Sequence, residues 1–95
     1  MNRIYQSPDE IKTLEDVHIF FYHLAFDLDI SFHPDDLFEE MVRPNDLGFF
    51  TPEKMKLYDS LMDKCWVVCT NANEDIYNLG IEYIRERFLK RDNIN

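Results

Sequence analysis

Proline placement constrains the fold of this chain more than any other feature of its sequence. Pro8, Pro34 and Pro52 are each followed by an acidic residue. This order is typical of the first turn of a helix, where proline loses no hydrogen bond and acids complement the helix dipole. Pro44 follows Arg43 and should end a helix, because proline disfavours helical backbone in the residue before it. The chain is therefore expected to fold as short helical segments between these positions.

Apolar residues recur at helical spacing between the prolines. We therefore expect an all-α fold, a compact bundle of about four helices preceded by a short helical turn that begins at Ser7. The segment from Leu28 to Phe32 alternates apolar and polar residues, so a minor β-hairpin with Phe49-Phe50 is an alternative there. The expected helices span residues 13–28, 34–42, 52–70 and 74–91.

Length and composition predict one hydrophobic core. The chain has 95 residues, of which 45% are hydrophobic, with eight Phe, five Tyr and one Trp. Chains of this size bury one core and rarely two. Because no linker or repeat interrupts the pattern, we expect residues 1–95 to form a single acidic helical domain.

The net charge of −9 limits the kinds of partner. Direct binding to nucleic acid needs clustered cations, so it is not expected. Residues 1–63 hold 14 acids and 5 bases, whereas residues 64–95 hold 5 of each. This distribution favours another protein, with a basic surface, as the partner.

The two cysteines and the amino-terminal sequence indicate a cytoplasmic protein. Cys65 and Cys69 fall in one expected helix and are interpreted as small buried residues of a reducing compartment. The first residues lack an apolar signal segment, and no stretch approaches 18 uncharged apolar residues, so no membrane association is expected.

The expected helix 13–28 carries more apolar surface than one contact requires. Besides its main apolar face it has a second stripe, formed by Ile19, Tyr22 and Phe26. The favoured interpretation is a central helix covered on both sides; the alternative is a partner-binding interface. The expected helix 74–91 shows a similar surplus, which a homodimer would cover, at Tyr77, Ile81 and Phe88.

Acidic residues are densest between residues 27 and 46, which hold seven acids and the single base Arg43. The spacing from Asp27 to Asp35 resembles the first ligands of an EF-hand loop. Phe32 stands where that loop needs glycine, however, and Glu39 comes one residue late. An ordinary solvated connection is therefore favoured over a cation site, and the candidate partner-binding acids are Asp35, Asp36, Glu39 and Glu40.

His23 and Asp27 lie one turn apart on the expected helix and could bind a metal or act as a base with its orienting partner. A surface hydrogen bond is favoured. Cys65 and Cys69 lack the further ligands of a tetrahedral zinc site. No catalytic or phosphate-binding motif occurs, so no catalytic residue, metal ligand or cofactor is assigned.

Gly80 falls on the apolar side of the expected helix 74–91, where glycine costs about 1 kcal/mol relative to alanine. We expect a close approach by another backbone, that of helix 13–28 or helix 52–70, to explain it.

Part of the chain resembles small uncharacterised acidic proteins from accessory or mobile regions of bacterial genomes. The resemblance rests on four stretches: Ser31–Phe38, Thr51–Met55, Leu61–Cys65 and Asp75–Tyr77. The resemblance spans about two-thirds of the chain and carries over no catalytic residue. It implies a bacterial cytoplasmic protein that acts by binding other proteins.

The leading hypothesis is a non-enzymatic protein-protein interaction or regulatory module. One alternative is an acidic mimic of nucleic acid that inhibits a DNA-binding enzyme. A second is a metal-binding protein or enzyme that uses His23 and Asp27.

Overall fold

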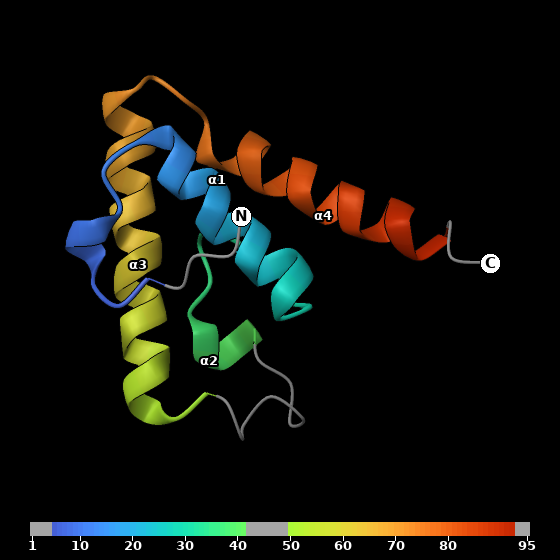
Figure 1. Cartoon of the computed structure of the whole chain (residues 1–95), viewed down its shortest axis with the longest axis horizontal. Coiled ribbons are helices and arrows are strands. Elements are labelled where there is room, and N and C mark those ends of the chain that lie inside the picture. The colour runs from blue at the N-terminus through green and yellow to red at the C-terminus, as the bar shows by residue number, and fades with distance from the viewer. Residues whose placement is uncertain (1–4, 42–49, 93–95) are drawn as a thin grey trace.

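The computed structural model describes residues 5–41 and 50–92 (Figure 1). Its elements are the 3-10 turn η1 (Pro8–Glu10), α1 (Leu14–Tyr22), the π-helical turn η2 (His23–Asp27), α2 (Phe38–Met41), α3 (Pro52–Asn71) and α4 (Ile76–Asp92). The predicted all-α class is confirmed. None of the described residues forms a strand, so Leu28–Phe32 is not part of a hairpin, and Phe49 lies outside the described residues.

The predicted helix starts at 13, 52 and 74 agree with the structure within two residues. Thr13 caps α1 and exchanges hydrogen bonds with Asp16 in a capping box, as Ser7 does with Glu10 in η1. The Thr51 hydroxyl accepts from the amide of Lys54 at the start of α3. These side chains satisfy amides that have no partner within the helix, which is why local sequence locates the starts.

The predicted start of the second helix at residue 34 is wrong. Residues 34–36 form a turn, and α2 begins only at Phe38. A helix from Pro34 would join the Pro34 carbonyl to the Phe38 amide. Here that carbonyl accepts from Trp66 Nε1 at 3.0 Å and that amide donates to Asp59 Oδ1 at 2.9 Å. Two bonds from α3 replace the helical one. The predicted end at 42 lies outside the described residues.

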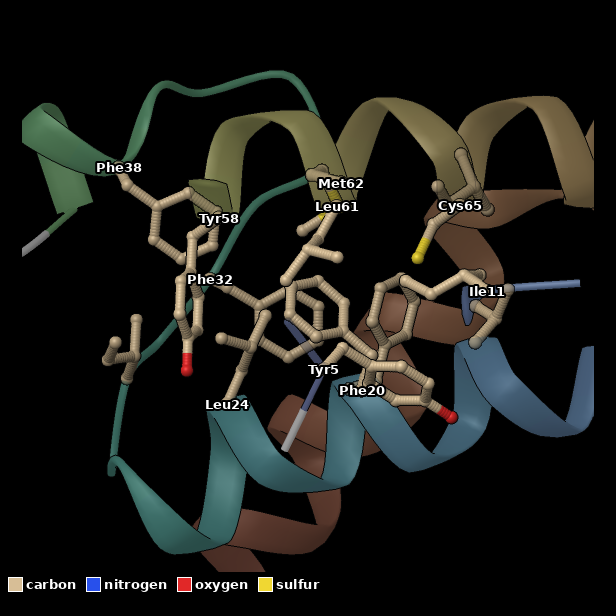
Figure 2. Packing of buried hydrophobic residues seen from close by; sticks show 14 of the residues in the cluster. Tyr5, Ile11, Phe20, Leu24, Phe32, Phe38, Tyr58, Leu61, Met62 and Cys65 are labelled. Carbon is tan, nitrogen blue, oxygen red and sulfur yellow. The ribbon is translucent and has the colours of Figure 1, made fainter. Parts of the chain in front are cut away.

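The core lies mainly between α1 and α3 and is rich in aromatic rings (Figure 2). Tyr58 of α3 is its centre, with ring centroids 5.7 Å from Phe20, 5.4 Å from Phe38 and 5.2 Å from Phe50. Each fully buried side chain of this size stabilises the fold by about 2–3 kcal/mol. The contact between Phe38 and Tyr58 therefore packs the start of α2 against α3.

Helix α4 packs against α1, η2 and α3 along its first part and then continues beyond α1 (Figure 1). Its Tyr83 contacts α1, with ring centroids 5.7 Å from His18 and 6.1 Å from Phe21. Among the described residues, no helix is long and apolar enough to cross a bilayer.

Gly80 lies on the buried side of α4, but the neighbour that explains it is not a helix backbone. A Cβ atom at Gly80 would lie 3.4 Å from Phe32 Cε2 and 3.5 Å from Pro34 Cγ. The expected approach of α1 or α3 is therefore corrected: side chains of the segment between η2 and α2 cover this glycine.

We predict that Gly80→Ala raises the free energy of unfolding by about 0.5–1 kcal/mol, because alanine restricts the unfolded chain and its methyl group meets ordinary van der Waals contacts. Gly80→Leu should destabilise by displacing Phe32 and Pro34. Urea unfolding of the three proteins measures both effects. A destabilised alanine variant would show that the segment packs more tightly than these distances imply.

The Asp16 carboxylate accepts four hydrogen bonds at the start of α1. Oδ1 accepts from the hydroxyl of buried Tyr5 at 2.8 Å, and Oδ2 accepts from the amides of Lys12 and Thr13 at 2.9 and 3.1 Å and from the Thr13 hydroxyl at 3.2 Å. Burial alone would raise the pKa of Asp16, but these bonds outweigh it and hold the pKa below its ordinary value of 3.8.

We predict that Asp16→Ala lowers the free energy of unfolding by about 1–2 kcal/mol at neutral pH. A depressed folded-state pKa gives stability that is present above the unfolded-state pKa and is lost as pH falls through the folded value. The difference between the two proteins should therefore shrink in acid, as measured by urea unfolding from pH 7 to pH 2. Asp63→Ala, an exposed acid of α3, is the control, and an equal loss in that variant would contradict the assignment.

Candidate functional site

Residues 35–40 form an acidic ledge on the surface. Asp35, Asp36, Glu39 and Glu40 are all exposed. Leu37 lies among them with 49% of its surface exposed, whereas Phe38 is fully buried. The ledge thus places one large apolar side chain within a group of carboxylates. The sequence identified the acids, but only the structure shows that Leu37 beside them is exposed.

The ledge is fixed to the scaffold through Tyr77 as well as through α3. The Tyr77 hydroxyl donates to both carboxylate oxygens of Asp35 at 2.8 Å. This bond to Asp35 raises the pKa of Tyr77. The ring of Tyr77 packs edge-on against Trp66, with centroids 5.3 Å apart. Trp66 also donates to the Pro34 carbonyl. The backbone just before the ledge is therefore fixed to α3.

The apolar stripe of Ile19, Tyr22 and Phe26 is neither fully buried nor fully open. Ile19 and Phe26 pack partly against the core, and Tyr22 is exposed. A groove of about 180 Å³ runs between α1 and α4 here, lined by His18, Ile19, Tyr22 and Tyr83. The stripe lies beside Tyr83 and the ledge beside Tyr77 and Asp59. The structure therefore places the two groups of candidate residues over different parts of the scaffold.

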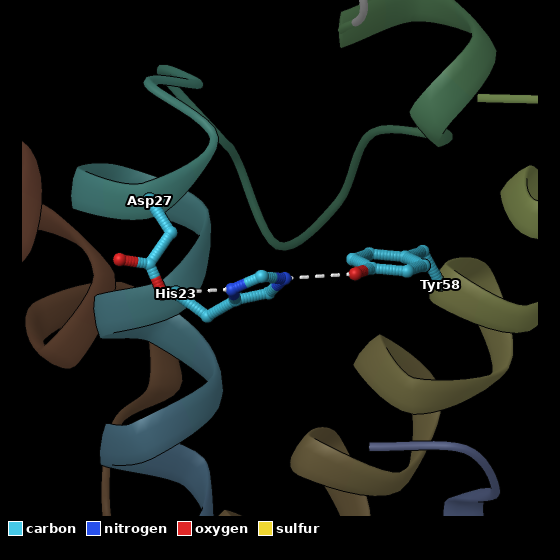
Figure 3. A network of polar contacts seen from close by, with 3 residues as sticks. All are labelled: His23, Asp27 and Tyr58. Carbon is cyan, nitrogen blue, oxygen red and sulfur yellow. Dashed lines mark hydrogen bonds and ion pairs between the residues drawn. The ribbon is translucent and has the colours of Figure 1, made fainter. Parts of the chain in front are cut away.

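His23, expected in a surface hydrogen bond, is instead buried (Figure 3). Its Nδ1 lies 3.0 Å from Asp27 Oδ2, as the spacing predicts, but its Nε2 lies 2.8 Å from the Tyr58 hydroxyl. Tyr58 of α3 reaches His23 at the start of η2. Nothing in the sequence pattern indicates this polar role of Tyr58, because only the packing of α3 brings Tyr58 and His23 together.

The arrangement assigns the protons of this network when His23 is neutral. Nδ1–H donates to the Asp27 carboxylate, and Nε2 accepts from the Tyr58 hydroxyl. Burial, and secondarily the charge of Asp27, raises the pKa of Tyr58 to about 12. Tyr58 therefore keeps its proton at neutral pH, and the network holds α1 and α3 together.

We predict that Tyr58→Phe lowers the free energy of unfolding by about 1–3 kcal/mol, because buried Nε2 loses its donor. A raised folded-state pKa gives stability that is complete below pH 10 and is lost as pH rises toward 12. Because phenylalanine has no hydroxyl to ionise, the variant should lose less unfolding free energy than the wild type between pH 10 and pH 12. Urea unfolding from pH 7 to pH 12 measures both effects.

The matched control is Tyr22→Phe, which removes the hydroxyl of an exposed tyrosine on α1. It should leave stability at neutral pH nearly unchanged. Equal effects of the two substitutions would contradict the bond between Tyr58 and His23.

The other reactive groups do not converge on one pocket. His18 Nδ1 lies 2.8 Å from the Tyr83 hydroxyl on the α4 side of α1, while His23 faces α3. Cys65 and Cys69 are free and buried, as expected, and burial raises the pKa of both thiols. In the described part of the chain, no group of three or more His, Cys, Asp or Glu side chains could hold a metal ion.

Comparisons with protein-family models, curated proteins and solved structures found no match to this chain.

Proposed function

We propose that this chain is a non-enzymatic protein-binding module whose acidic ledge docks a basic surface of another protein. The observation that carries the proposal is the exposure of Leu37 among Asp35, Asp36, Glu39 and Glu40. An apolar anchor supplies contact area at the centre of an interface, and surrounding charges set orientation and the rate of association.

The way the ledge is held supports a binding role. Its first acid is bonded to Tyr77, and the amide of Phe38 is bonded to Asp59. A recognition segment that is already ordered loses little entropy on binding. Rigid presentation of Leu37 therefore favours a defined partner surface.

Catalysis through His23 and Asp27 has less support. Both ring nitrogens of His23 are engaged, and the histidine is buried under α3. The raised pKa values of Cys65 and Cys69 keep these thiols protonated, which makes them poor nucleophiles.

Mimicry of nucleic acid is also less supported. A mimic should align carboxylates along one extended face, as phosphates are aligned. Exposed acids occur on α1 at Glu15, on α3 at Glu53 and Asp63, and on α4 at Glu82, as well as on the ledge.

The test is affinity capture from host lysate with the wild-type chain and with a ledge variant, Asp36→Asn, Leu37→Ala, Glu39→Gln and Glu40→Gln. We expect a basic protein to be retained by the wild type at low salt and lost at high salt. Binding of that purified protein to the ledge variant should be weaker by at least about tenfold.

The matched control removes the same three charges and truncates one exposed aliphatic residue elsewhere, by Glu53→Gln, Asp63→Asn, Val67→Ala and Glu82→Gln. It should bind like the wild type. The absence of any salt-sensitive partner, or equal retention by the ledge variant, would refute the proposal.

A further inference from the structure

Helix α4 carries a line of exposed side chains four residues apart, at Tyr77, Ile81, Arg85 and Leu89. Tyr77 is 37% exposed, Ile81 and Leu89 are each 54% exposed, and Arg85 is also exposed. Positions i, i+4 and i+8 form one of the ridges by which helices pack into each other's grooves. We call these four residues the α4 ridge.

Ile81, Arg85 and Leu89 are exposed on the side of α4 away from the core. Tyr77 lies at the edge of that side, where its ring also contacts Trp66. The helix packs inward through residues such as Ile76 and Gly80, which are buried. Its ribbon also extends past α1, so its last turns lie away from the other described elements (Figure 1). Ile81 and Leu89, with the exposed part of the Tyr77 ring, are therefore available along about 18 Å of helix for a contact outside this fold.

Charge is distributed unequally along α4. Its beginning lies next to exposed Glu74 and Asp75, and Asp35 is bonded there to Tyr77. Its last turns are basic in sequence, with four bases and one acid from Arg85 to Arg91. An antiparallel neighbour with the same sequence would place its basic end against this acidic beginning.

We propose that the α4 ridge is a homodimer interface, in which two copies of this chain pair their α4 helices antiparallel about a two-fold axis. Such an isologous contact uses the same surface on both copies and is the commonest symmetry of soluble oligomers. In this arrangement the apolar ridges of the two copies pack against each other. The acidic beginning of each α4 also lies beside the basic end of the other.

The spacing of the ridge gives a specific pairing. With the axis near residue 83, Tyr77 lies opposite Leu89 of the second copy, and Ile81 lies opposite Arg85. The Arg85 guanidinium then reaches toward the ring of Tyr77 and the carboxylate of Asp35, which offer a cation–π contact and an ion pair. Asp35, already held by Tyr77, needs no rearrangement to accept it.

This inference goes beyond the proposed function, since it concerns another partner and a surface that shares only Asp35 with the ledge. Leu37, Glu39 and Glu40 take no part in the pairing. A dimer would present two ledges, so a partner with two basic surfaces would gain from binding both at once.

Sedimentation equilibrium of the full chain, over a range of concentrations and at low and high salt, is the test. We expect a reversible dimer that weakens as salt rises. Ile81→Lys should raise the dimer dissociation constant by at least about 100-fold, because it places a second cation opposite Arg85 at both symmetric positions of the interface. Val67→Lys, at an aliphatic residue of α3 that is 51% exposed, is the matched control and should dimerise like the wild type.

Charge exchange tests the pairing itself. Arg85→Glu and Asp35→Lys should each weaken self-association, and mixing the two variants should restore dimers, because each mixed pair regains opposite charges at both contacts. Circular dichroism checks that both variants keep their helices. A wild type that stays monomeric at the highest concentration, an Ile81→Lys variant that dimerises normally, or a failure of the mixture to associate would overturn the proposal. Loss of partner binding by the ledge variant with its dimer intact would separate the two proposals.

Discussion

The hydrogen bond between the Tyr58 hydroxyl and His23 Nε2 sets how α1 and α3 meet. It directs the ring of Tyr58 into the cluster that also holds Phe20, Phe38 and Phe50. Within that cluster an unpaired polar atom would be costly, so the two helices can approach only where hydroxyl and imidazole face each other. The aromatic core and this polar pair therefore depend on a single relative placement of α1 and α3.

The end of α1 follows from the same placement. At His23 the helix widens into the π-turn η2, after which the Leu28 amide donates to the His23 carbonyl at 3.0 Å. Asp29 then adopts a left-handed φ of 56°, and the Ile30 amide returns to the Leu24 carbonyl at 2.9 Å. Turns of this kind end a helix and redirect the chain. The chain is thereby sent across Gly80 of α4 toward the ledge.

Tyr77 is where the two proposed interaction surfaces meet. Its hydroxyl holds Asp35, the first acid of the ledge, and its ring begins the α4 ridge. Trp66 supports both, by contact with Tyr77 and by its bond to the Pro34 carbonyl. The position of one tyrosine therefore contributes to both surfaces.

By itself the sequence determined the helical class, the helix starts at Thr13 and Thr51, and the exposed acids, because caps, prolines and charge act within a few residues of themselves. It also predicted the contact of His23 with Asp27. Only the tertiary structure decided that His23 is buried against Tyr58, that α2 begins at Phe38 and that Leu37 is exposed. The first two depend on groups from α3, some 20 to 35 residues away, which cover the histidine or replace the local helical bond. Local pattern holds no information about such distant partners.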